Sequence, residues 1–264
     1  MKNARLNLMS PSYQVFGLAV VLLAVWEGIC RYGHVSPLVL PAPGGIVVRL
    51  YGMFAEGSVW PHLMVTLTEV LIGFGVGIAS GLVVGALVSL VPAVEKLVYP
   101  YLVALQTIPK VAVAPLLVIW FGYGLTSKVV ITALICFFPI LVSVISGFHS
   151  TDRDQLDMMR AYGATTLQTL VRLRIPSALV LIFAGLEIAS VLSVIGTIVG
   201  EFVGAQAGLG YLIMTYNFNL DITGVFAVLI VLSAIGMTLH SITRFAGRRY
   251  IFWIRREPMA VMPH

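Results

Sequence analysis

The chain has 264 residues, of which 59% are hydrophobic and only 10% are charged, and its mean hydropathy is +1.00. A water-soluble domain could not cover that much apolar surface, whereas lipid can solvate it, so the composition predicts an all-α membrane protein. The two cysteines, Cys30 and Cys136, lie in separate apolar runs and indicate neither a disulfide framework nor a metal site.

Six apolar runs are long enough to cross a bilayer, whose hydrocarbon core of about 30 Å takes about 20 helical residues. They cover Tyr13–Tyr32, Leu63–Leu90, Leu97–Phe121, Lys128–Phe148, Ala178–Gly200 and Ile222–Phe245. The first run is too long for the core of a signal peptide, which predicts a retained helix. The third contains three prolines, so we expect its middle, Thr107–Lys110, to be kinked or partly unwound.

Basic residues are distributed unevenly between the two sides of this predicted bundle. With a cytoplasmic N-terminus, twelve of the sixteen Lys and Arg residues fall on the cytoplasmic side, which predicts that both termini are cytoplasmic. The net charge of +5 then reflects topology and anionic headgroups rather than nucleic acid. Outside, the predicted loops cover 33–61, with an interfacial helix from about Ile46, and 201–221; the main cytoplasmic segment covers 149–176.

This cytoplasmic segment begins with a predicted short helix. Thr151, followed three residues later by Asp154, fits a capping box and indicates a helix over about Asp152–Tyr162. Gly163 then suits a left-handed terminating position.

A second short helix is predicted over about Thr166–Arg174, because apolar residues recur on one face at helical spacing. Pro176 is expected to fix the turn into the next span. Two interpretations of the segment stay open: its helices lie on the membrane surface, or they form a docking site for a soluble partner that moves.

The segment resembles a known family. Asp157-Met158-Met159, then Gly163, then Leu173-Arg-Ile-Pro176 is similar to the signature cytoplasmic loop of binding-protein-dependent ABC importer permeases. Members usually have Glu-Ala-Ala where this chain has Asp-Met-Met, so the carboxylate is kept but the bulkier pair implies a roomier partner groove.

The resemblance extends nearly end to end. The motifs Leu40–Pro43, Ile108–Leu116, Trp120–Gly122, Phe138-Pro139 and Gly208–Ile213 look like the nitrate/sulfonate/taurine/bicarbonate-type branch. The resemblance implies a single permease domain over 1–264 with the type I importer fold, in a bacterial inner membrane.

The family also implies partners. Two copies would form a homodimeric pore, an external solute-binding protein would deliver substrate, and an ATPase dimer would hold ATP and magnesium. This chain has no Gly-x-x-x-x-Gly-Lys-Ser/Thr phosphate-binding loop, so we expect no catalytic residue and no cofactor on it. The residues implied to couple it to the ATPase are Asp154, Asp157, Met158, Met159, Arg160, Ala161, Tyr162, Gly163 and Pro176.

Charged side chains inside apolar spans need a reason, because a central one costs about 2.5–3.5 kcal/mol on insertion scales. Glu27 and Glu69 are expected to lie near enough to span ends to reach water. We hypothesise that Lys110, in the proline-broken span, and Glu187, in the middle of the fifth, face the translocation path near one another. Ser190 and Ser193 either line the same path or bond a neighbouring carbonyl; both alternatives stay open.

Small residues recur along the second span and predict close helix packing; they are Gly73, Gly75, Gly77, Ser80, Gly81, Gly85 and Ala86. Glycines after Glu201 suit a tight re-entrant turn. The histidines form no ligand pattern, so no metal site is predicted.

The leading hypothesis is the permease subunit of an ATP-driven importer. The alternative is an ion-coupled secondary transporter, which would favour paired carboxylates or inverted repeats that this sequence does not show. An intramembrane enzyme would need a nucleophile–base pair or a metal cluster. For the substrate, Glu187 and the run 194–203 look nearer to branch members for heterocycles or vitamin precursors.

Overall fold

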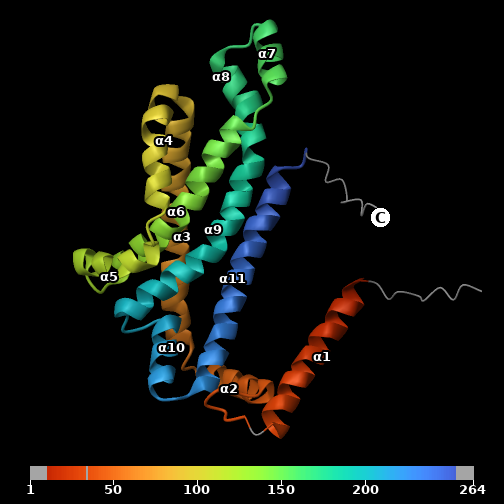
Figure 1. Ribbon diagram of the computed structural model, residues 1–264, viewed down its shortest axis with the longest axis vertical. Helices are drawn as coiled ribbons and strands as arrows, with labels where there is room; N and C mark the ends of the chain where they lie inside the picture. Colours follow the sequence, from red (N-terminus) through yellow and green to blue (C-terminus); the bar gives the residue numbers. More distant parts are fainter. Residues whose placement is uncertain (1–10, 34, 254–264) are drawn as a thin grey trace, which may run out of the picture. The chain divides into compact units, whose positions relative to one another are not determined.

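The computed structural model describes residues 11–33 and 35–253, and within them every regular element is a helix (Figure 1). The helices are α1 (Pro11–Tyr32), α2 (Pro43–Ala55), α3 (Trp60–Leu90), α4 (Pro92–Gln106), α5 (Lys110–Phe121), α6 (Leu125–His149), α7 (Arg153–Ala161), α8 (Thr166–Thr169), the π-helix η1 (Leu170–Arg174), α9 (Ile175–Gly204), α10 (Leu209–Phe218) and α11 (Ile222–Tyr250). The all-α fold class is confirmed.

Four of these helical segments are long and apolar enough to cross a membrane: α3, α6, the continuous run Thr166–Gly204, and α11. The predicted third span is broken into α4 and α5, which are bent by 94° and raise the number of spans to as many as five if counted as one. The break at Thr107–Pro109 confirms the expected kink, since Pro109 cannot continue the helix that ends at Gln106. The first expected span forms α1, and its crossing of the membrane stays a prediction.

The chain divides into two compact units, one of residues up to 62 with 212–231 and one of residues 63–211 with the chain from 232 onward. In the first unit, the Glu27 carboxylate accepts a hydrogen bond of 2.8 Å from the backbone N–H of Gly44, at the start of α2, and pairs with Arg31. The carboxylate therefore stabilises the positive end of α2. Arg49 pairs with Asp221 at 2.8 Å, and Asp221 caps α11 by accepting from Gly224 N–H. A single domain over 1–264 stays a prediction.

In the second unit, α6 packs directly against α3 through small residues. A Cβ added at the α3 glycines would lie 2.5 to 2.9 Å from α6 side chains, closer than packing allows. The contacts, which confirm the predicted close packing, are Gly73 to Thr132, Gly77 to Cys136, Gly81 to Ile140 and Gly85 to Val144. The partners also recur every fourth residue, so α3 and α6 run in the same direction with their backbones in close approach.

Helices α9 and α6 pack against each other in antiparallel orientation. Gly185 of α9 faces Ser143, Gly196 faces Thr132 and Gly200 faces Lys128, so residue numbers rise on one helix as they fall on the other. Helix α6 is therefore the centre of a tightly packed trio of α3, α6 and α9.

Candidate functional site

The predicted cytoplasmic helix forms as α7, but its cap differs from the expected one. Asp152 is the N-cap, in an extended conformation, and its side chain accepts a hydrogen bond of 3.0 Å from the backbone N–H of Asp154. Thr151 is buried, and its hydroxyl has no hydrogen-bond partner among the described residues. The prediction of a Thr151 capping box was wrong because the neighbouring residue, Asp152, occupies the N-cap position of α7.

The turn after α7 is the left-handed one that the sequence predicts. Gly163 has φ +69°, a conformation that a residue with a Cβ adopts only with strain. Its N–H donates to the carbonyl of Arg160 at 2.9 Å, and Ala164 N–H donates to that of Met159 at 3.0 Å. These bonds satisfy the carbonyls at the end of α7 and return the chain toward the membrane spans.

The second predicted helix starts where expected but does not end before the next span. Thr165 and Gln168 form a reciprocal capping box, which the sequence reading missed. From Thr166 the chain stays helical through η1 into α9, giving one continuous segment of 39 residues to Gly204. Pro176 lies inside this helical segment, directly after the π-helix η1, so the predicted turn at this residue is wrong.

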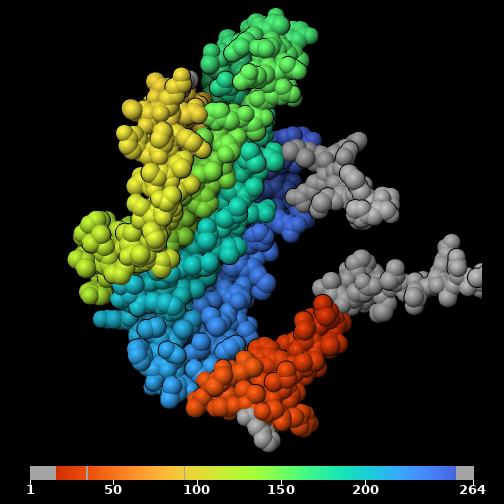
Figure 2. Space-filling model, viewed as in Figure 1, coloured from red at the N-terminus to blue at the C-terminus, as the bar shows by residue number. Residues whose placement is uncertain are grey.

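Helices α7 and α8 form a lobe at one end of the second unit (Figure 2). No residue of α7 is buried, and large apolar side chains are exposed on α7 and its C-cap and on α8 and η1. We call these side chains the lobe surface; they are Met158, Tyr162, Leu167 and Val171, with exposures of 51%, 84%, 68% and 54%. Exposed apolar groups on a protruding helical pair are typical of a contact surface.

Acidic and basic side chains accompany the lobe surface. Asp157 pairs with Arg160 at 3.0 Å, one turn apart on α7, and both are mostly exposed. Such a pair adds little stability in water. Asp154 and Ala161 are also exposed, whereas Met159 is half-buried.

A network of buried polar groups lies at the other end of α6, and the sequence reading missed most of it. Lys128 pairs with Glu69 at 2.9 Å, and their side chains are only 8% and 1% exposed. The expectation that Glu69 reaches water was therefore wrong. Its burial is tolerated because the Lys128 ammonium compensates its charge.

The same network holds the loop that follows α9. The Thr66 hydroxyl donates to Glu201 at 2.6 Å and accepts from Leu209 N–H at 2.7 Å, while Gly210 N–H donates to the other Glu201 oxygen. Gly208 has φ +121°, and a Cβ there would collide with the Glu201 carboxylate. The glycines are thus needed for close approach, and the predicted tight turn is confirmed. We call Thr66, Glu69, Lys128 and Glu201 the carboxylate network.

A cavity of about 570 Å³ adjoins this network, bordered by Glu69, Lys128, Tyr123 and Gln206. Its size suits a small solute.

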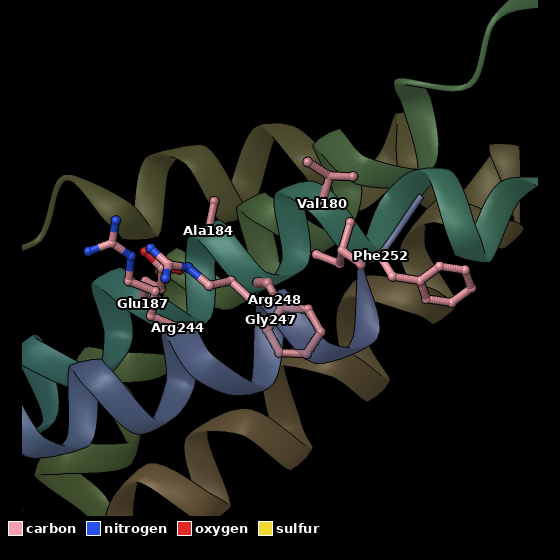
Figure 3. Close-up of a pocket in the computed structure, with 9 residues that line it drawn as sticks. Val180, Ala184, Glu187, Arg244, Gly247, Arg248 and Phe252 are labelled. Carbon is pink, nitrogen blue, oxygen red and sulfur yellow. The ribbon is translucent and has the colours of Figure 1, made fainter. Parts of the chain in front are cut away.

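Glu187 lies at a second cavity, and that it faces the translocation path stays a prediction. It borders a cavity of about 580 Å³ with Arg244 and Arg248 of α11 (Figure 3). Helices α9 and α11 run in opposite directions here, since Gly247 faces Phe183 and Gly236 faces Val194. Glu187 is consequently level with the arginine-bearing end of α11 rather than with its apolar middle.

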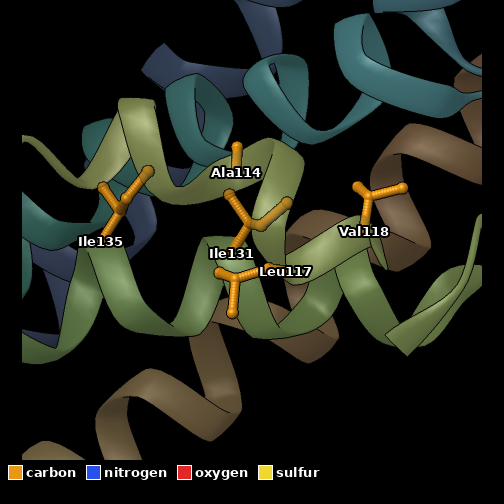
Figure 4. Close-up of a cluster of buried hydrophobic side chains, with 5 residues drawn as sticks. All are labelled: Ala114, Leu117, Val118, Ile131 and Ile135. Atoms are coloured by element: carbon orange, nitrogen blue, oxygen red, sulfur yellow. The ribbon is translucent and has the colours of Figure 1, made fainter. Parts of the chain in front are cut away.

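Lys110 has other neighbours. Its ammonium donates to the carbonyl of Gln106 at 3.0 Å, across the break between α4 and α5, and lies 4.6 Å from the centre of the Phe138 ring. Helix α5 is held on α6 by an apolar cluster of Ala114, Leu117, Val118, Ile131 and Ile135 (Figure 4). The structure therefore gives Lys110 and Glu187 separate surroundings.

The two serines bond carbonyls of their own helix. Ser190 donates to Glu187 O and Ser193 to Ser190 O, each at 2.7 Å, and both are fully buried. Their lining of a path stays a prediction. Among residues 11–33 and 35–253, no group of three or more His, Cys, Asp or Glu side chains could hold a metal ion.

Comparisons with known proteins agree on one family. Residues 73–252 match the model of the binding-protein-dependent transport system inner membrane component. The chain is 40% identical to the formylaminopyrimidine transport permease ThiX of Halalkalibacterium halodurans, over 87% of this chain and 92% of ThiX. It is 30% identical to the putative aliphatic sulfonates transport permease SsuC of Bacillus subtilis, over 89% of this chain and 86% of SsuC.

The fold is similar to that of solved transporters. An inward-facing structure of the MetNI methionine ABC transporter matches with a TM-score of 0.62 and 23% identity, covering 76% of this chain and 99% of that one. With the family model covering most of the chain and the sulfonate permease among the relatives, the chain belongs to the binding-protein-dependent transport system inner membrane components, the permeases of ABC importers.

Proposed function

We propose that this chain forms, with a second copy of itself, the translocation path of an ATP-driven importer. An external binding protein delivers the solute, and a cytoplasmic ATPase dimer, which holds ATP and magnesium, supplies the work. The observation that carries the proposal is the unbroken helix from the lobe into the bundle, Thr166–Gly204.

This helix is a suitable transmission element. At 39 residues it is on the order of 60 Å long. One end carries part of the lobe surface, and the other carries Glu201, which bonds the loop at Leu209 and Gly210. A displacement of the lobe by an ATPase therefore reaches the carboxylate network through one continuous helical segment, with no loop between them.

Close packing converts this displacement into a change of the whole bundle. Backbone contacts at Gly185, Gly196 and Gly200 leave α9 no room to slide on α6 without repacking. Two discrete packings, biased by ATP in the partner and by the loaded binding protein, give alternating access.

The distribution of basic residues supports the orientation. The lobe and the Arg244–Arg249 end of α11 belong to the predicted cytoplasmic side, in a bacterial inner membrane with both termini cytoplasmic. The path we propose runs past Lys110 at the α4–α5 break and along the helix that carries Ser190 and Ser193. Glu187, whose neighbours are arginines, is left out of it.

A small nitrogen heterocycle is the solute class we favour. The support is the 40% identity to a permease named for formylaminopyrimidine, over nearly the full length of both chains. Titration of the cognate binding protein with pyrimidines and with alkyl sulfonates would distinguish the two classes.

The deciding experiment is copurification followed by reconstitution. The tagged chain should retain an ATPase subunit through detergent purification, and the complex should accumulate solute only with binding protein and ATP. Concentrative uptake by this chain alone, driven by a proton or sodium gradient, would establish the secondary transporter instead.

A further inference from the structure

We propose that the cavity between α9 and α11 binds the headgroup of an anionic phospholipid, with its phosphate between Arg244 and Arg248. The cavity, called here the arginine pocket, measures about 580 Å³. The residues that line it include Val180, Phe183, Glu187, Arg244, Arg248 and Phe252.

The two arginines are placed for an oxyanion. They lie one turn apart on α11, both are exposed, and both border the same cavity (Figure 3). Among residues 11–33 and 35–253, neither guanidinium has a carboxylate within 4.0 Å. Guanidinium groups recognise phosphate through paired, charge-assisted hydrogen bonds.

The rest of the pocket is apolar, which favours a lipid over a free ion. Val180 and Phe183 of α9 and Phe252 line it. Gly247 deepens it, because a Cβ there would lie 3.0 Å from the Phe183 ring. Such walls suit the glycerol and first acyl carbons that accompany a phosphate at the bilayer surface. Basic pockets between spans are known to take anionic headgroups.

Glu187 sets the charge of the pocket. Two guanidinium groups and one carboxylate leave a net charge of +1, which complements the single negative charge of a phosphodiester such as phosphatidylglycerol. The carboxylate also weakens binding of any anion, so its removal should strengthen it.

The test uses fluorescence of Trp253, which is 43% exposed and contacts Phe252, with ring centres 5.2 Å apart. In the full chain with its other three tryptophans replaced by Phe, bilayers of brominated phosphatidylglycerol should quench Trp253 more than bilayers of brominated phosphatidylcholine. Arg248→Gln should lower the relative affinity for phosphatidylglycerol at least about tenfold, because it removes a charge-assisted contact to the phosphate in addition to the general attraction of a basic residue at a membrane surface.

Arg249→Gln is the matched control, because it removes the same charge from the next residue, which does not line the pocket. It should lose at most about fivefold, the general attraction of one basic residue at a membrane surface, whereas Glu187→Gln should bind phosphatidylglycerol more tightly. Equal losses in Arg248→Gln and Arg249→Gln would replace the site with diffuse surface attraction and overturn the proposal.

Two further measurements distinguish a lipid site from the absence of lipid preference and from a site for a soluble phosphate. Native mass spectrometry of the unaltered chain should show phosphatidylglycerol retained in preference to phosphatidylcholine; no preference overturns the proposal whatever the tryptophan variants do. Millimolar glycerol phosphate should leave the quenching unchanged, and displacement of the lipid by it would assign the arginines to a soluble phosphate instead.

Discussion

The hydroxyl of Thr66 donates a hydrogen bond of 2.6 Å to the carboxylate of Glu201, 135 residues further along the chain. The same hydroxyl accepts from the backbone N–H of Leu209 at 2.7 Å. One side chain of α3 thereby fixes both the end of α9 and the loop that follows it. All three groups are buried, so none can exchange its partner for bulk water without local opening.

Thr66→Val should therefore destabilise the protein by about 1–3 kcal/mol, since it leaves a buried carboxylate oxygen and a buried N–H unsatisfied. Thermal unfolding of the detergent-purified chain measures the loss. Thr68→Val is the matched control, because the exposed Thr68 bonds only the carbonyl of Met64 in its own helix. Equal melting temperatures for the two variants would contradict a role for the network in holding the loop.

The buried pair of Glu69 and Lys128 predicts a stronger effect of charge removal. Lys128→Met leaves the Glu69 carboxylate buried without its ion partner, and a loss of about 3–5 kcal/mol is expected. The double variant with Glu69→Gln should recover part of the loss, because the uncompensated charge is gone. Lys96→Met, at an exposed position, should be nearly neutral in the same unfolding assay. A double variant no better than the single one would show that packing rather than charge dominates here.

The glycine row of α3 gives a prediction with a control two residues away. Gly77→Val places a Cβ 2.7 Å from Cys136, which forces α3 away from α6, whereas a Cβ at Gly75 meets no atom within 4 Å in Gly75→Val. Overpacking of this kind costs about 1–3 kcal/mol. Unfolding curves of the two variants should differ by that amount, and a closer match would mean that α3 and α6 separate freely.

Features encoded within a few residues were predictable from the sequence. The close packing of small residues on α3, the left-handed turn at Gly163 and the proline break before Lys110 each depend on local backbone chemistry, and all three are confirmed, although Gly75 of α3 faces no neighbour. The errors in the lobe were also local. Thr151 and Asp152 are adjacent cap candidates, and Pro176 follows a π-helix through which the chain stays helical instead of turning.

The buried network and the arginine pocket were not predictable in this way. Glu69 and Lys128 are 59 positions apart, and only the parallel packing of α3 on α6 brings them together. Glu187 lies in the middle of an apolar run of the sequence. The helical segment that carries it begins in the lobe, at Thr166, and its packing against α11 places Glu187 beside the charged end of α11. The hydrophobicity pattern of each span does not show how far neighbouring helices are shifted relative to one another along their axes. This shift decides which charged side chains come together.

Gly163 tests the coupling role of the lobe. In Gly163→Val a β-branched residue must hold φ +69°, at a cost of about 1–3 kcal/mol that falls on the turn between α7 and α8. No atom lies within 4 Å of the added Cβ, so the strain is confined to the backbone and the spans should insert normally. We expect the purified complex to lose ATPase subunit or to hydrolyse ATP without solute uptake. Gly163→Asn, which tolerates the left-handed conformation, should retain most coupling. Full uptake coupled to hydrolysis in Gly163→Val would remove this turn from the transmission of work.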